Sequence, residues 1–476
     1  MNSIPAFMDK VRWIGQLAMA LQLVQASTVQ AQDDPDFQRR LSNLESLWEK
    51  APDPSKRRKA SSLADSTMFM RLTGQHGNAA KALDFAIATL DSRNDGRNSP
   101  NWHDALDLKV ADRFVDPSID TIRCSILMAY MPEPPPPPGS TATVTWEVNQ
   151  RPMPDVLVTL KGKRTNFELK PPAGLSTITI SLATEATDSG AKLVRKTSAT
   201  VQSVPNWTST KARMTAMRKE VMKIPDGLGK LTWIHRMDKA LSGPDAWPGG
   251  WQQALSLPDI DISDIEKNHW PSPVTGTDQV LVFPGGKGGR IIRVRLPAKS
   301  AEAENKPCAL VALHGLGDTE DSWIEGYGGK LAKHCDDRKW ILVSPRNGWD
   351  ADLKPMLEKW CGQAWGRTGL VGFSKGGSQA MACAAERPAD WTAIVTIGAS
   401  GRTGSGEAYR NLPMFLGIGI DDPAHASCVS MVKRMLDDGQ RRLHFHQADN
   451  TGHLMGPVAI LPRALDFLDG FLGGKQ

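Results

Sequence analysis

The sequence predicts a protein of several domains whose C-terminal part is an α/β domain, a mostly parallel sheet with helices on both faces. From residue 275 to 476, short apolar stretches alternate with helical segments of about 10 to 15 residues, which is typical of such a sheet. Residues 141–204 instead alternate apolar and polar side chains with a period of two, as in a β-sandwich. Residues 33–130 carry leucine and alanine at helical spacing.

The composition excludes several classes of function. The chain has 57 basic and 52 acidic residues, and this near balance gives no reason to expect a nucleic-acid partner. Its six cysteines form no C-x-x-C pair, so we expect neither a zinc site nor a redox motif, and the sequence implies no cofactor. Cys335 and Cys361 could form a disulfide if the chain is exported, a pairing that the sequence leaves open.

Residues 1–31 have the pattern of a signal peptide. Lys10 and Arg12 precede an apolar stretch at 13–24, and the small residues Val29 and Ala31 follow where a signal peptidase would cut. We therefore expect export to the periplasm or beyond; the alternative is an amphipathic first helix of a cytoplasmic protein. No other run approaches the roughly 20 apolar residues that span a bilayer, so we expect no transmembrane segment.

The first half of the chain is predicted to consist of appended modules. Residues 33–130 should form a small helical region, ended by the proline-rich linker 131–140. Residues 141–204 should form a small β-sandwich that resembles immunoglobulin-like modules. Residues 205–274 are expected to be a connector of helices and loops.

The C-terminal region, 275–476, begins with a predicted hairpin and continues with alternating strands and helices. The ligand site of such a sheet lies beyond the carboxyl ends of its strands. The expected strands are 279–283, 290–296, 308–313, 340–344, 368–373, 392–397, 414–420 and 441–447, and the expected helices are 322–335, 352–359, 378–385, 427–438 and 462–471.

The stretch from Gly372 to Gly376, G-F-S-K-G, has the pattern of a nucleophile elbow. Small residues on both sides of Ser374 allow the tight turn that exposes a serine oxygen at the end of a sheet. Asp421, Asp422 and His453 also follow predicted strands. The order serine, aspartate, histidine is that of α/β-hydrolases.

Four motifs carry a family resemblance. L-H-G-L-G-D-T at 313–319, G-F-S-K-G-G at 372–377, G-I-D-D-P at 419–423 and G-H at 452–453 resemble the acyl-protein thioesterase and carboxylesterase group of the α/β-hydrolase superfamily. They are also similar to polyhydroxybutyrate-depolymerase-like and feruloyl-esterase-like enzymes. The resemblance covers roughly residues 275 to 476. It implies an α/β-hydrolase fold and serine ester hydrolysis, with a small-molecule or polymeric ester as substrate.

The expected roles follow from serine chemistry. A serine hydroxyl is a weak nucleophile at neutral pH, so Ser374 needs a neutral imidazole, for which His453 is the candidate. An aspartate must hold that imidazole in the right tautomer, and Asp421 and Asp422 compete for this role. The resemblance favours Asp422, since the G-x-x-D-P spacing is similar to a turn of these esterases.

Other residues are expected around this triad. The backbone N–H of Lys375, which follows the nucleophile, should form half of an oxyanion hole, and the resemblance gives Leu316 as the second donor. Trp349 and Asp350 are expected to line the acyl or alcohol pocket. A serine peptidase with accessory domains is the alternative enzyme, and a binding protein with an inactive hydrolase fold is the alternative without catalysis.

Overall fold

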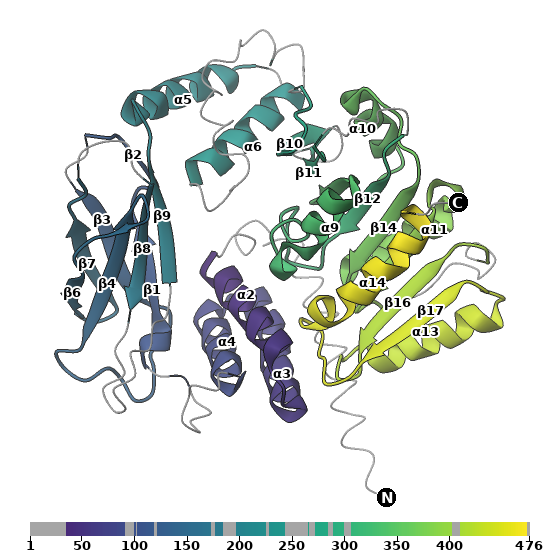
Figure 1. Cartoon of the computed structure of the whole chain (residues 1–476), viewed down its shortest axis with the longest axis horizontal. Helices are drawn as coiled ribbons and strands as arrows, with labels where there is room; N and C mark the ends of the chain where they lie inside the picture. Colours follow the sequence, from purple (N-terminus) through teal and green to yellow (C-terminus); the bar gives the residue numbers. More distant parts are fainter. Residues whose placement is uncertain are drawn as a thin grey trace, which may run out of the picture.

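The computed structural model describes residues 35–90, 100, 102–118, 121–172, 177–183, 197–224, 228–242, 265, 272–283, 289–298, 306–401 and 410–473 (Figure 1). The predicted signal peptide, 1–31, lies outside these residues, and so does most of the connector between 243 and 271.

Within the described residues, the C-terminal half is built on an eight-stranded sheet in the order β10-β11-β13-β12-β14-β15-β16-β17. Strand β11 runs antiparallel to both neighbours, whereas the strands from β13 to β17 are all parallel, so the predicted hairpin and parallel sheet are confirmed. The strands are β10 (Asp278–Phe283), β11 (Arg290–Arg295), β12 (Ala309–Leu313), β13 (Ile341–Pro345), β14 (Thr368–Phe373), β15 (Ala393–Ile397), β16 (Met414–Gly419) and β17 (Leu443–Ala448).

Helices cover both faces of this sheet. The helices α9 (Lys330–Arg338) and α14 (Gly456–Leu472) pack on one face. The helices α10 (Leu353–Cys361), α11 (Lys375–Glu386) and α13 (His425–Asp437) pack on the other. Strands β12, β14, β15 and β16 are buried along their whole length, as expected of parallel strands between two helical layers. This is the α/β-hydrolase fold.

Two helix starts differ from those predicted by six residues or more. The helix expected at 322–335 begins only at Lys330, because Gly328 and Gly329 adopt left-handed backbone with φ of 69° and 66°. Helix α14 begins at Gly456 rather than at residue 462. Pro457 lies in its first turn, where a proline has no hydrogen bond to lose.

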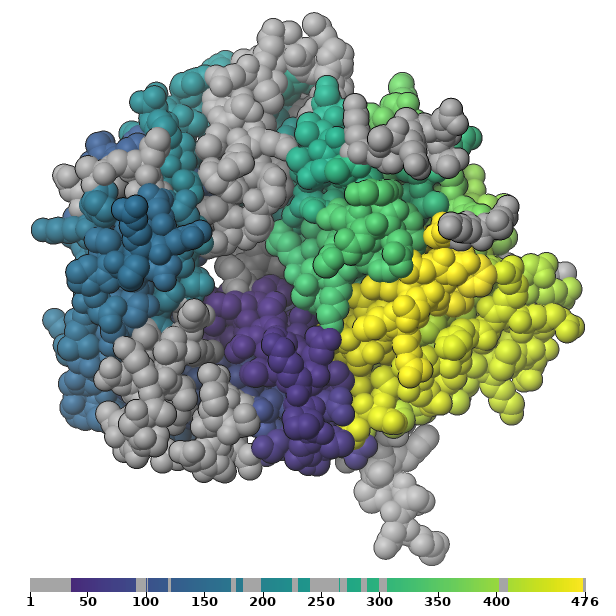
Figure 2. Space-filling view, viewed as in Figure 1, coloured from purple at the N-terminus to yellow at the C-terminus, as the bar shows by residue number. Residues whose placement is uncertain are grey.

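The N-terminal helices share a core with the hydrolase sheet. These are α2 (Pro35–Lys50), α3 (Pro54–Leu72) and α4 (His76–Leu90). Leu44, Trp48 and Leu83 are buried in the same apolar cluster as α9, α14 and one face of the sheet. The purple N-terminal helices accordingly abut the yellow C-terminal segment in Figure 2. The two ends of the described chain therefore form one packed body.

Three strands lie within the region that was predicted to be helical, which corrects that prediction. Strands β1 (Leu106–Val110), β2 (Phe114–Val115) and β3 (Ile122–Met128) precede the proline run. In β3, Ile122, Cys124 and Ile126 alternate inward, so the period is two rather than 3.6. Because β3 pairs with β7 (Arg164–Leu169), strands from both sides of the proline run belong to one sheet.

Two sheets pack face to face, and the proline run leads from β3 in one sheet to the next strand, which lies in the other. One has the order β1-β3-β7; the other has the order β2-β9-β8-β4-β5, with β6 paired to β4. Their inner faces share one apolar core. The remaining strands are β4 (Thr141–Val148), β5 (Arg151–Pro152), β6 (Val156–Thr159), β8 (Thr177–Ala183) and β9 (Thr197–Ser203).

Two helices lead from this sandwich to the hydrolase sheet, α5 (Trp207–Val221) and α6 (Leu228–Ser242), and α6 packs against β10 (Figure 1). Among the helices of the described ranges, none is long and apolar enough to cross a bilayer. All six cysteines lie in those ranges and are free thiols, so Cys335 and Cys361 are not paired.

Candidate active site

Ser374 lies at the sharp turn between β14 and α11. Its φ of 54° and ψ of −118° are strained for a residue with a side chain. The turn depends on its glycines. A Cβ on Gly372 would lie 2.3 Å from the carbonyl oxygen of Gly376, and one on Gly376 would lie 2.2 Å from that of Leu313. Steric crowding thus explains why glycine occupies these two positions of the predicted elbow.

The structure brings together Ser374, His453 and Asp422. Nε2 of His453 lies 2.9 Å from Oγ of Ser374, and Nδ1 lies 2.7 Å from Oδ2 of Asp422. Ser374 follows β14, Asp422 follows β16 and His453 follows β17, so the parallel sheet delivers all three to one edge. The arrangement has the connectivity of a nucleophile, a base and an acid.

The structure separates the two adjacent aspartates. Asp422 is 4% exposed, and its Oδ1 accepts the N–H of Ala424 at 2.7 Å. Asp421 points away and accepts from Nε of Arg58 on α3 at 2.9 Å, in an ion pair that is partly open to solvent. Only Asp422 reaches the imidazole.

Opposing effects act on the imidazole of His453. Burial lowers its pKa, since it penalises the charged ring. The hydrogen bond to Asp422 and that carboxylate's charge act the other way, and so do the charges of Asp65 and Asp318. The net effect raises the pKa of His453 above its ordinary value. The surroundings of His453 thus favour the protonated form of its imidazole.

The elbow packs against the loop that follows β12. Because β12 and β14 are neighbours, Leu313 lies opposite Gly372 in register. A Cβ on Gly376 would also lie 2.6 Å from the carbonyl oxygen of His314, so this loop approaches the start of α11 closely. Lys375 is the first residue of α11, where backbone N–H groups have no acceptor within the helix. The loop that carries Leu316 therefore begins next to the first turn of α11.

His314 supports this loop. Its Nδ1 lies 2.8 Å from the carbonyl oxygen of Gly315, and its Nε2 lies 2.6 Å from that of Arg346, just after β13. The guanidinium of Arg346 in turn donates to Glu320, from Nη2 at 2.9 Å and also from Nε. The backbone of Arg346 thus holds one end of the loop and its side chain holds the other.

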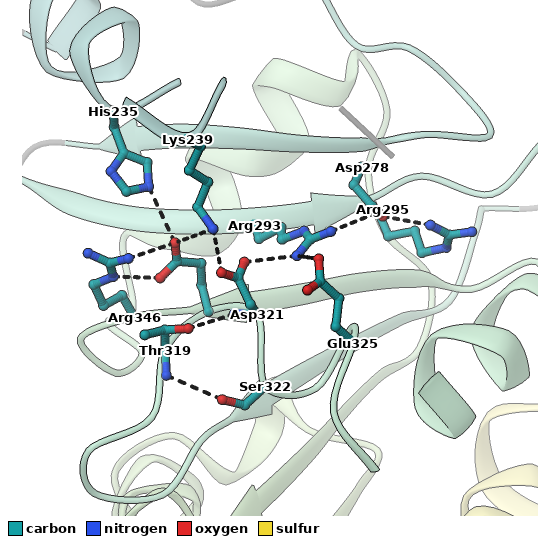
Figure 3. Close-up of polar contacts among 11 residues, drawn as sticks. His235, Lys239, Asp278, Arg293, Arg295, Thr319, Asp321, Ser322, Glu325 and Arg346 are labelled. Atoms are coloured by element: carbon teal, nitrogen blue, oxygen red, sulfur yellow. Dashed lines mark hydrogen bonds and ion pairs between the residues drawn. The ribbon is translucent and has the colours of Figure 1, made fainter. Parts of the chain in front are cut away.

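Glu320 is the centre of a buried ionic network that sequence reasoning missed. Figure 3 labels its partners His235, Lys239 and Arg346. His235 and Lys239 of α6 reach its Oε1 at 3.3 and 3.4 Å. Burial alone would raise the pKa of Glu320, but these partners and Arg346 hold it well below its ordinary value. The loop after β12 is therefore fastened to α6 as well as to β13.

The network continues along β11. Arg293 is 1% exposed and binds Asp278 at 3.0 Å, Asp321 at 2.8 Å and Glu325 at 2.6 Å. Lys239 also pairs with Asp321 (Figure 3). The partners come from β10, β11, α6 and the loop after β12, so one set of ion pairs joins elements far apart in the chain.

Trp349 and Asp350 lie away from the serine. The carbonyl oxygen of Trp349 lies 3.7 Å from Sγ of Cys383. Cys383 is nine residues along α11 from Ser374, which is about 14 Å at the helical rise. Trp349 and Asp350 line a cavity of about 310 Å³ there, together with Trp391 and Arg290. The structure does not bring these two residues to the triad.

Asp65 is a further residue at the site that sequence reasoning missed. It lies on α3, and its carboxylate accepts the backbone N–H groups of His453 and Leu454, each at 2.8 Å. No local signal marks it, since it belongs to no motif and is 388 residues from His453. Within the described part of the chain, no group of three or more His, Cys, Asp and Glu side chains is placed to hold a metal ion.

No protein-family model matches the chain, and no curated protein matches it. Among solved structures, it is similar to a ferulic acid esterase at 18% identity, covering 40% of this chain and 96% of that one, with a TM-score of 0.34. It is also similar to a feruloyl esterase module from Clostridium thermocellum at 16% identity, covering 42% and 90%, with a TM-score of 0.35. It is likewise similar to an S-formylglutathione hydrolase from Agrobacterium tumefaciens at 13% identity, covering 43% of this chain and 98% of that one, with a TM-score of 0.35.

Proposed function

We propose that the protein is a serine hydrolase of carboxylic esters that acts through an acyl-enzyme intermediate. The observation that carries this proposal is the unbroken chain from Ser374 through His453 to Asp422, with atom separations of 2.9 and 2.7 Å. The strained backbone at Ser374 supports it, because such strain persists where the surrounding structure enforces it and is concentrated at functional sites.

In this mechanism Nε2 of His453 takes the hydroxyl proton as Oγ of Ser374 attacks the ester carbonyl. The imidazolium that forms is stabilised by Asp422 and then gives its proton to the departing alcohol. A water molecule, activated by the same imidazole, releases the acid and restores the serine. The backbone N–H of Lys375 and that of Leu316 would stabilise the oxyanion of each tetrahedral intermediate.

The test combines labelling with substrate profiling. A fluorophosphonate probe should label the wild-type protein, and Ser374→Ala should abolish both labelling and turnover while leaving the melting temperature close to that of the wild type. The substrates are p-nitrophenyl esters of rising chain length, feruloyl esters, acetylated sugars and peptide amides. An unlabelled wild type, or labelling that persists in the Ser374→Ala variant, contradicts the proposal. Faster cleavage of the amides than of the esters would favour a peptidase.

A further inference from the structure

Helix α3 reaches the backbone of the loop that carries His453. Oδ2 of Asp65 accepts the N–H of His453 and Oδ1 accepts that of Leu454, so both carboxylate oxygens are used. The two N–H groups stand immediately ahead of α14, which begins at Gly456. The positive end of a helix dipole favours an anion at this place. Asp65 thus binds the loop by two hydrogen bonds and by charge.

We propose that Asp65, on an N-terminal helix outside the hydrolase sheet, is a positioning residue for His453. It fixes the loop so that Nε2 faces Ser374, and its charge stabilises the imidazolium. The inference rests on the proposed function, because it assumes that His453 is the base. It makes the N-terminal helices part of the catalytic unit, although they contribute no residue to the triad.

Gly452 is fitted to this contact. A Cβ at residue 452 would lie 2.3 Å from Oδ2 of Asp65 and 3.1 Å from Cβ of Ser61, so a side chain there would push the loop and α3 apart. Since φ of Gly452 is not positive, the glycine is required here by close approach rather than by backbone conformation. The loop has the one residue that lets the carboxylate come within hydrogen-bonding distance.

Helix α3 is itself held firmly. Ala60 and Ala64 are fully buried in the core shared with the sheet. Trp48 on α2 donates from Nε1 to Oγ of Ser61 at 2.9 Å. The carboxylate of Asp65 therefore projects from a packed helix, and such support can hold a base within the tolerance that catalysis needs.

Three carboxylates face His453 from three elements: Asp422 after β16, Asp318 after β12, and Asp65 on α3. Asp65 in turn faces His453 and Asp422. Burial raises the pKa of Asp65 to about 6, against the lowering effect of its two N–H bonds. At pH 8 its carboxylate is ionised, so its charge is present in an ordinary esterase assay.

The main variant is Asp65→Asn, assayed at pH 8 after fluorophosphonate labelling has shown that the wild type is an active serine hydrolase. The amide removes the charge and keeps only one acceptor oxygen for the two N–H groups. We expect kcat to fall by up to about 100-fold, the order of effect of a small misplacement, with KM nearly unchanged because Asp65 does not touch substrate. In the pH profile of kcat/KM, the acid limb should move to lower pH, because His453 loses a neighbouring negative charge that raises its pKa.

Arg58→Ala is the matched control. It removes a different polar contact between α3 and the active-site loops, the exposed pair with Asp421, and should leave kcat and the pH profile unchanged. If Asp65→Asn gives only a lower melting temperature, with kcat and the acid limb of the wild type, the inference is overturned. If the wild type is not labelled, it is the proposed function that fails.

Gly452→Ala serves if Asp65→Asn does not fold, because it displaces the same carboxylate from the side of the loop. The acid limb should again move to lower pH. A lower kcat with an unmoved acid limb would show steric damage to the loop alone and would overturn the inference.

Discussion

The replacement Asp422→Asn tests the triad through the tautomer of its histidine. Oδ1 of Asp422 accepts the N–H of Ala424 at 2.7 Å, and Oδ2 lies 2.7 Å from Nδ1 of His453. An asparagine would keep its oxygen on the Ala424 N–H, because the amide NH₂ cannot accept there. Its NH₂ group would then face Nδ1 and donate to it. This leaves the ring proton on Nε2, the atom that must accept the proton of Ser374.

The expected loss in kcat is on the order of 10⁴-fold, the effect of the wrong tautomer in a serine triad. At about 1.4 kcal/mol per tenfold, this is about 5.6 kcal/mol of transition-state stabilisation. Asp421→Asn is the matched control, since it makes the same chemical change one residue away. It breaks only a solvent-accessible pair with Arg58, worth about 1 kcal/mol of stability or less.

The assay is steady-state hydrolysis of a p-nitrophenyl ester by both variants, with thermal unfolding to show that each is folded. Asp422→Asn should retain a melting temperature near that of the wild type, because the asparagine is isosteric and keeps the Ala424 hydrogen bond. Equal losses of kcat in the two variants, or a larger loss in Asp421→Asn, would refute the assignment of the acid.

Two further predictions concern stability. Burial raises the pKa of Glu45 to about 8, so the contribution of its carboxyl to stability is fully present below about pH 4, its unfolded pKa, and is lost as pH rises through 8. The melting temperature of Glu45→Gln should therefore match that of the wild type near pH 4 and exceed it at pH 9. An equal difference in melting temperature at both pH values would count against this. Arg293→Met leaves three carboxylates without their buried partner and should cost about 3 to 5 kcal/mol in chemical denaturation. Arg295→Met, at a side chain that is 25% exposed, should cost clearly less, and equal costs would contradict the burial argument.

The sheet and its three reactive side chains could be predicted because their signals are local. Each buried strand is a short apolar run, and the elbow around Ser374 is a contiguous pattern whose glycines have a steric cause. Asp65 could not be predicted, since only the packing of α3 on the hydrolase core brings it to His453. The strands at 106–128 were missed because the conspicuous prolines at 134–138 suggested a domain boundary, whereas β3 and β7 pair across them.

The position of Trp349 and Asp350 illustrates a different limit. Both follow a strand of the sheet, which is the usual place for substrate contacts. The loop after β13 runs alongside α11, however, and a Cβ on Gly348 would lie 3.2 Å from the side chain of Gln379. At Trp349 the chain lies near Cys383, toward the C-terminal end of α11. Sequence position along a loop does not fix the direction in which the loop travels.

The core shared by α2, α3, α4 and the hydrolase sheet has a consequence for the synthesis and folding of the protein. Helix α14 follows the other described elements of this apolar cluster in the chain, whereas α2, α3 and α4 precede them. Until α14 has been synthesised, the nascent chain therefore exposes apolar surface of this core. A shortened protein that starts at residue 275 would display that surface permanently, and it would lack the carboxylate that fastens the histidine loop.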